Sequence, residues 1–280
     1  MVLNVADNGT LNPNQLVLET DGTVSGDPWN DQRSYIMAGQ ILQTATTPPL
    51  LLAWITPATT EVDLSGAGND ATYSNFVTTD QNAEGMVWSL DFYGGTNEYL
   101  TVGDDDAFSW DDTGSVPWSV CFWIEVVETA AIQTVIAKYD VQSTDREWKI
   151  VLDAAEKMQF ELFDEADDKP ATNLTDAALS SGWHFVAHTY DSTGGASALS
   201  DTASVWYVDG VAVAETQSVD GDYTGMVAGA TDVTIGGYDT GAAIANFFQG
   251  DMGAIWIEDV ELSAAAVWKY YMQTRGYYNK

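Results

Sequence analysis

Residues 183–213 read WHFVAHTYDSTGGASALSDTASVWYVDGVAV, and this stretch decides the fold. Residues 184–189 alternate between two faces, which is the period-2 pattern of a sheet strand. Residues 205–208 are β-branched or aromatic, as strands are. Asp209 and Gly210 then supply a tight turn, because glycine adopts positive φ without steric cost and aspartate tolerates it. The stretch therefore predicts two strands, the second of which continues into a hairpin.

The same stretch resembles the WHHVAxTYD…VxLYVDGxxV core of the laminin-G-like, concanavalin A-like jelly rolls. Other segments resemble further motifs of this family in the family's order, over roughly four-fifths of the chain. Residues 62–73 resemble D-x-S-G-x-G-N-D-x-T, residues 116–126 resemble FTISxWI, and residues 233–237 and 247–257 resemble LTIGG…FxGxIDxVxI. Residues 262–267 resemble the LSxxEI start of a terminal helix, which Ser263 would cap. The resemblance implies an all-β, two-sheet antiparallel jelly roll with a short C-terminal helix.

The N-terminal residues 1–47 do not fit this pattern, so we divide the chain into an accessory arm, residues 1–47, and a jelly roll, residues 48–280. The arm ends in the linker TATTPP, residues 44–49, where prolines remove donors and fix φ. Two interpretations stay open: an extra edge strand followed by a linker, or an arm that docks onto other subunits. Its apolar residues must pack on the sandwich or on a partner, and we expect the partner.

Charge is the strongest feature of the composition. Acidic residues number 42 against 9 basic residues, which gives a net charge of −33. Self-repulsion of this size opposes compaction at low ionic strength, whereas roughly 1 M salt shortens the Debye length to about 3 Å and screens it. The composition is typical of proteins from salt-loving organisms, and it argues against nucleic acid and anionic membranes as partners, since both require basic surface.

Targeting signals and disulfides are not expected. The chain has no apolar run near the 18 residues of a membrane-spanning helix, and its first residues, MVLNVADNGTL, lack the basic and apolar regions of a Sec-type signal peptide. Cys121 is the single cysteine and lies among apolar neighbours, so we expect a buried thiol.

A calcium site is one candidate. The loop around Asp63, Asn69 and Asp70 presents hard oxygen ligands on a glycine-bent backbone, and in the family that it resembles this loop often holds a structural ion. The family's G-x-I-D motif reads Gly-Asp-Met-Gly here, so Gly253 replaces its aspartate and Asp251 is the candidate substitute. The alternative is an ordinary Asx and glycine turn.

Catalysis is not expected. Laminarinase-type enzymes share the jelly roll and carry an E-x-D-x-E or E-x-D-x-x-E strand, but the acidic clusters at residues 161–165 and 258–261 lack that spacing. His184 and His188 lie about 13 Å apart on a strand and cannot share one metal ion. Two histidines are enough in number for a Ser-His-Asp hydrolase, but the chain has no G-x-S-x-G elbow.

Carbohydrate binding is the common role of the family that the chain resembles. It requires exposed aromatic faces beside polar groups, and Trp110, Trp118 and Tyr238 lie near loop signals. Each tryptophan is also a candidate for the core.

We therefore predict a non-catalytic surface module in a high-salt environment. The preferred context is a decoration, turret or fibre subunit of a virus that infects a halophile, oligomeric in its assembly, joined to other subunits through residues 1–47 and in contact with host glycans. The alternatives are a secreted or cell-surface carbohydrate-binding protein and, after it, a glycoside hydrolase of the jelly-roll type.

Overall fold

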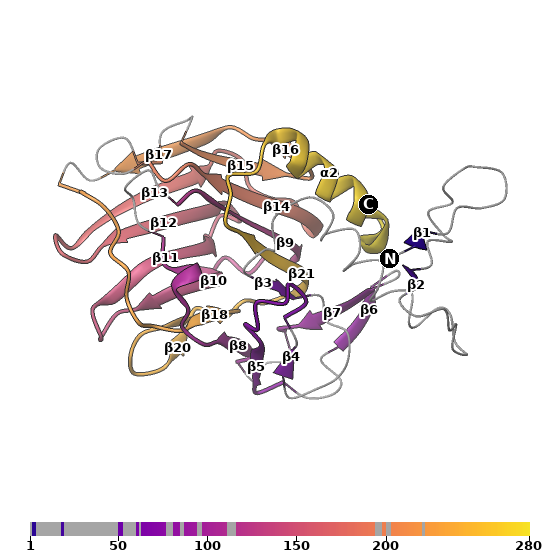
Figure 1. The fold of residues 1–280 in the computed structure, drawn as a ribbon, viewed down its shortest axis with the longest axis horizontal. Coiled ribbons are helices and arrows are strands. Elements are labelled where there is room, and N and C mark those ends of the chain that lie inside the picture. The colour runs from indigo at the N-terminus through magenta and orange to yellow at the C-terminus, as the bar shows by residue number, and fades with distance from the viewer. Residues whose placement is uncertain are drawn as a thin grey trace.

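The protein folds into two antiparallel β-sheets that pack face to face, with one short helix against the outside of one sheet (Figure 1). The structure, a computed structural model, describes residues 2–3, 18–19, 50–52, 60–61, 63–76, 81–84, 87–93, 97–110, 116–193, 198–199, 203–219 and 222–280. Within these ranges the predicted all-β jelly roll with a terminal helix is confirmed.

One sheet is built around β9 and is called the β9 sheet below. Its strands, in spatial order, are β16 (Val211–Ala212), β15 (Ser204–Val208), β14 (Gly182–Tyr190), β9 (Trp118–Val126), β21 (Asp251–Glu258), β7 (Val87–Asp91) and β6 (Gln81–Glu84), and β3 (Leu50–Leu52) also pairs with β21. The stretch quoted first therefore forms β14, β15 and β16, and Asp209 and Gly210 form the predicted turn with φ of 49° and 80°.

The opposing sheet is built around β10 and is called the β10 sheet. Its strands, in spatial order, are β17 (Glu215–Val219), β13 (Lys169–Thr175), β12 (Met158–Asp164), β11 (Asp145–Leu152), β10 (Gln133–Asp140), β18 (Val233–Ile235), β8 (Tyr99–Val102), β5 (Ala71–Ser74) and β4 (Thr60–Glu61). In addition, β19 (Tyr238–Asp239) pairs with β10, and β20 (Ile244–Ala245) pairs with β19. A 3-10 turn, η1 (Asp106–Phe108), follows β8.

The main core lies between the two sheets and is filled by alternate side chains from each strand. Leu100 and Val102 of β8 face Phe122 and Ile124 of β9 across this layer, and all four are fully buried. Because side chains of a strand alternate between faces, the residues between them point away from the core. This alternation sets the outer surface of each sheet.

The outer face of the β9 sheet is covered by the C-terminal segment, α2 (Ala264–Thr274) and η3 (Arg275–Tyr278) (Figure 1). Ser263 caps α2 by accepting a hydrogen bond from the Ala266 amide, as predicted. Trp123 of β9 stacks on Tyr278 with ring centroids 4.3 Å apart and donates its indole hydrogen to Thr274. The expected burial of Cys121 is confirmed in this second core.

Most of the predicted arm lies outside the described residues. Within it, Val2–Leu3 and Leu18–Glu19 form the paired strands β1 and β2, and the linker at residues 44–49 is not among the described residues. Among the helices that the structure describes, none combines the length and the apolar composition that crossing a membrane requires.

Candidate functional site

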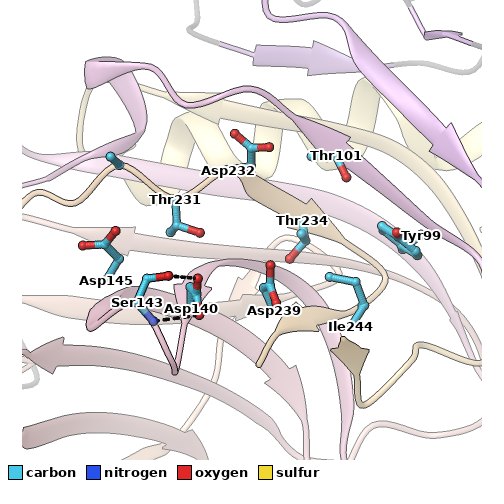
Figure 2. Close-up of a pocket in the computed structure, with 11 residues that line it drawn as sticks. Tyr99, Thr101, Asp140, Ser143, Asp145, Thr231, Asp232, Thr234, Asp239 and Ile244 are labelled. Atoms are coloured by element: carbon cyan, nitrogen blue, oxygen red, sulfur yellow. Dashed lines mark hydrogen bonds between the residues drawn. The ribbon is translucent and has the colours of Figure 1, made fainter. Parts of the chain in front are cut away.

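A polar pocket of about 370 Å³ opens on the outer face of the β10 sheet (Figure 2). Its lining comes from six strands and two connecting segments, many of them far apart in sequence: Tyr99, Thr101, Asp140, Ser143, Asp145, Ala230, Thr231, Asp232, Thr234, Asp239 and Ile244. The pocket thus combines carboxylates, hydroxyls and one aromatic ring.

Strand alternation creates the floor of this pocket. Thr101 of β8 and Thr234 of β18 are directly paired across the sheet, while the residues that flank them in each strand fill the main core. The Thr234 hydroxyl donates its hydrogen to the carbonyl of Gly237 at 2.7 Å, which leaves its oxygen as an acceptor. The same alternation that buries the aliphatic residues therefore presents a row of hydroxyls on the outside.

Asp140 is held rigidly at one wall of the pocket. Its carboxylate accepts hydrogen bonds from the amides of Gln142 and Ser143 and from the Ser143 hydroxyl. Burial of Asp140 opposes ionisation, but these hydrogen bonds outweigh it and lower the pKa of the carboxyl. Gly241 closes the wall with φ of 78°, and a Cβ at this position would lie 2.8 Å from the Asp140 carboxylate.

An aromatic strip with paired charges adjoins the pocket. Tyr238, the residue before Asp239, packs edge-on against Tyr139 with centroids 5.8 Å apart, and the Lys149 ammonium lies 4.0 Å from the centre of the Tyr139 ring. Glu161 joins the strip, since it pairs with Lys149 at 2.7 Å and accepts the Tyr139 hydroxyl at 3.0 Å. Burial, followed by the charge of Glu161, raises the pKa of Tyr139. Tyr238 is thus partly exposed and precedes the pocket residue Asp239 in β19, but it is not among the residues that line the pocket.

The other two predicted sugar platforms are core residues. Trp110 and Trp118 are 1% and 0% exposed and stack on each other with centroids 3.9 Å apart. Trp110 also stacks on Trp148, so the three rings close one end of the main core. A buried ring cannot present its face to a ligand, and the prediction that Trp110 and Trp118 bind carbohydrate is wrong for this physical reason.

The predicted calcium loop is held together by its own hydrogen bonds. The Asp63 carboxylate accepts from the amides of Ser65, Gly68 and Asn69 and from the Ser65 hydroxyl, and the Asp63 amide donates to Asp70 at 2.8 Å. This is the Asx and glycine turn that the sequence left open. Calcium binding by this loop stays a prediction.

Asp251 does not complete that site. It lies in β21 of the β9 sheet, opposite Asp91, and accepts the Ser89 hydroxyl at 2.7 Å. Among the described residues, no group of three or more histidine, cysteine, aspartate or glutamate side chains could hold a metal ion. Gly253, which replaces the family's aspartate, leaves room for the C-terminal segment, because a Cβ there would lie 2.2 Å from the Tyr278 hydroxyl oxygen.

The two histidines make separate contacts. His188 is fully buried, its Nε2 contacts the Ser204 hydroxyl, and burial lowers its pKa to about 3. His184 lies between Ser180 and Asp209 in the order of a catalytic triad, with Nε2 3.0 Å from the Ser180 hydroxyl and Nδ1 3.2 Å from Asp209.

The Ser180 carbonyl argues against a catalytic role for this group. It also lies 3.0 Å from His184 Nε2. An imidazole that donates to this carbonyl has no lone pair at Nε2 to accept the serine proton, so it cannot act as the general base. The contacts instead tie the segment before β14 to the turn after β15.

The sequence patterns did not predict this pocket. Its carboxylates are single residues at the ends of β10, β11 and β19 and in the loop before β18, in a chain that is rich in aspartate. The detectable signal was the alternation in β8 and β18, where Thr101 and Thr234 stand between apolar residues. That signal marks an outward face and does not show that distant segments meet over it.

Comparisons with known proteins agree with this fold. Solved structures similar to this chain include the binding domain of Paraclostridial Mosquitocidal Protein 1, with 13% identity, a TM-score of 0.56 and coverage of 80% of this chain and 52% of that one. Another is the receptor binding domain of botulinum neurotoxin mosaic serotype C/D, with 15% identity, a TM-score of 0.54 and coverage of 81% and 50%. A third is the ligand binding domain of botulinum neurotoxin serotype D in complex with N-acetylneuraminic acid, with 15% identity, a TM-score of 0.50 and the same coverage.

The chain spans about half the length of these structures, and identities this low show the shared fold alone. No curated protein matches the chain. The sequence profile of the concanavalin A-like lectin/glucanases superfamily, in its laminin-G form, matches residues 94–267, which is more than half of the chain. The protein is therefore a member of the concanavalin A-like lectin/glucanase superfamily.

Proposed function

We propose that the protein is a non-catalytic recognition module that binds neutral glycans in the pocket of the β10 sheet. The observation that carries the proposal is a polar pocket of about 370 Å³ that has the partly exposed Tyr99 in its lining and Tyr238 next in the chain to its Asp239. This volume lies at the lower end of the range for small-molecule sites. Sugar hydroxyls donate to carboxylates such as Asp239 and exchange hydrogen bonds with threonine hydroxyls, while an aromatic face such as Tyr238 packs on the sugar ring.

The charge of the pocket supports a neutral ligand. The carboxylates of Asp140, Asp145, Asp232 and Asp239 line it, and the described lining contains no lysine or arginine. A sugar acid would place a further negative charge among them at a repulsive cost. One structure with the same fold was solved with N-acetylneuraminic acid, an acidic sugar. We expect this chain to differ from that protein in its preference.

The contacts of the acidic clusters support a non-catalytic role. Glu161 is engaged by Lys149 and Tyr139, and Glu258 is fully buried with its Oε1 hydrogen-bonded to Tyr270. A retaining glycosidase requires two carboxylates on one accessible face. Neither residue is available for that arrangement.

The biological context is part of the same proposal. The net charge of −33 suits a surface protein in concentrated salt, and the arm before residue 48 suits attachment to other subunits. We place the module on the surface of a virus that infects a halophile, with a structural calcium ion in the loop of Asp63, Asn69 and Asp70. Mass spectrometry of purified particles from a salt-loving host tests the location.

Titration calorimetry in high salt tests the glycan proposal. We expect neutral oligosaccharides to bind and their sialylated forms to bind more weakly. Tyr238→Ala and Asp239→Asn each remove one contact worth about 1.4 kcal/mol or more, which corresponds to roughly tenfold weaker binding.

Asp259→Asn is the matched control, because it makes the same charge change at an exposed position just after β21. Circular dichroism confirms that each variant folds. Equal binding by the pocket variants and the control would refute the pocket, and binding of acidic sugars alone would refute the proposed selectivity.

A further inference from the structure

The outer side of helix α2 carries large apolar groups that the described structure leaves exposed. Trp268 and Met272 follow one another at the spacing of one helical turn and are 45% and 40% exposed. Val211 of β16, 57% exposed, lies in a strand that contacts α2. The backbone at Gly210 brings the helix and this hairpin together, because a Cβ there would lie 2.8 Å from the Trp268 ring. We call Val211, Trp268, Lys269 and Met272 the α2 surface.

The charge of this segment is opposite to that of the rest of the chain. Residues 263–280 contain no aspartate or glutamate and carry three of the nine basic residues, whereas all 42 acidic residues lie elsewhere. Lys280 pairs with Asp209 at 3.5 Å, and Arg275 lies over the Tyr271 ring. Lys269 is exposed beside Trp268 and makes no ion pair with any residue that the structure describes.

From this arrangement we infer that the α2 surface docks onto the acidic surface of a second copy of this chain. Tryptophan and methionine are enriched in protein interfaces, and tryptophan is among the residues that dominate binding energy. Lys269 adds a positive charge that an acidic partner surface complements. The complementary acidic surface is present on every copy, because the remaining chain is so strongly negative. This inference is independent of the glycan pocket and of residues 1–47.

The contact is head-to-tail. A two-fold contact would place the α2 surface against itself and bring Lys269 close to its own symmetry mate, which opposes pairing. Docking on a different, acidic face of the next copy removes that repulsion. Such a contact can extend into a ring or a row of subunits.

Association through the α2 surface should depend on the salt concentration. At low ionic strength the repulsion between two copies of charge −33 acts over the whole interface, since the Debye length is about 10 Å at 0.1 M salt. At about 1 M salt the Debye length falls to about 3 Å. Long-range repulsion is then screened, while ion pairs in direct contact and the burial of apolar side chains remain. Association therefore increases with salt.

Sedimentation velocity of the full chain across a salt series tests the inference. We expect a monomer in low salt and concentration-dependent association in high salt. Trp268→Ser and Lys269→Glu weaken the association at least tenfold, as expected at the centre of an interface. Ile132→Ser and Lys157→Glu are the matched controls, since they make the same changes outside α2, and they associate like the unaltered protein.

Peroxide oxidation of Met272, followed by mass spectrometry, identifies the surface that is covered. Protection that grows with protein concentration supports docking by a second copy. Protection that is independent of concentration means that the chain covers its own helix and overturns the inference. A protein that stays monomeric at every salt concentration, α2 variants that associate normally, or flotation with anionic phospholipid vesicles through Trp268 would also overturn it.

Discussion

The buried carboxyl of Glu258 should make the stability of the protein depend on pH, and Glu258→Gln should remove that dependence. Glu258 ends β21 under helix α2 and is fully buried. Its Oε1 accepts the Tyr270 hydroxyl at 2.6 Å, while its Oε2 has no hydrogen-bond partner among the described residues. Burial, opposed by the Tyr270 hydrogen bond and assisted by the charge of Asp259, raises its pKa from 4.5 to about 7. The folded protein therefore holds a proton that the unfolded chain releases.

The sign and size of the effect follow from this difference. The contribution of Glu258 to stability is fully present below pH 4.5 and is lost as the pH rises through 7. Complete ionisation costs about 3 kcal/mol, because each pKa unit corresponds to about 1.4 kcal/mol. Glu258→Gln keeps an acceptor for Tyr270 but cannot ionise, so its stability relative to the unaltered protein should rise by about 2.5 kcal/mol between pH 5 and pH 8, since part of the effect is already present at pH 5.

Urea denaturation followed by tryptophan fluorescence, in high salt and over this pH range, measures the difference. Any packing cost of the amide group changes the free energy of unfolding of the variant by the same amount at every pH. It therefore does not affect how the difference in stability changes with pH. Glu128→Gln is the control, since it makes the same change at an exposed position. If the stability curves of Glu258→Gln and the unaltered protein run parallel from pH 5 to pH 8, the reasoning about this carboxyl is refuted.

Other substitutions and conditions test the remaining features. The melting temperature should rise with salt concentration, because screening relieves the self-repulsion of a chain with net charge −33. A melting temperature that does not change with salt would contradict the halophilic interpretation. The purified protein should release no reducing sugar from β-glucans, and turnover that disappears in Glu161→Gln would show catalysis. Gly253→Ala should destabilise the fold by about 1–3 kcal/mol or more, since its methyl group meets the Tyr278 ring, whereas Gly276→Ala, with open space around it, should be nearly neutral in denaturant titrations.

Local patterns predicted the sheets well, because strand periodicity and turn chemistry act over a few residues. The hairpin at Asp209 and Gly210 follows from the φ values that only such residues adopt cheaply, and the structure has it at those positions. The cap at Ser263 is a local hydrogen bond of the same kind. In each case the decisive interaction lies within four residues of the signal.

The site depends on contacts that local patterns do not contain. Trp110 follows a run of exposed aspartates, yet its ring turns inward to stack on Trp118 and Trp148, from different sheets. Asp140 and Asp239 meet at the pocket because one residue of β19 pairs with the end of β10. Nothing in either neighbourhood distinguishes these aspartates from the many that cap turns.

The C-terminal segment decides which outer face of the sandwich is open to a ligand. The outer face of the β9 sheet carries large aromatic groups such as Trp123 and Trp256, and α2 and η3 bury them (Figure 1). The outer face of the β10 sheet instead carries hydroxyls, paired charges and the pocket. Since the α2 surface and the pocket belong to opposite sheets, docking through Trp268 does not use the pocket of the copy that supplies the helix. If the acidic face that receives the helix is not the pocket itself, a row of subunits would present a repeated array of the proposed binding sites. Under the two proposals together, weak binding at each pocket would become strong attachment through multivalency.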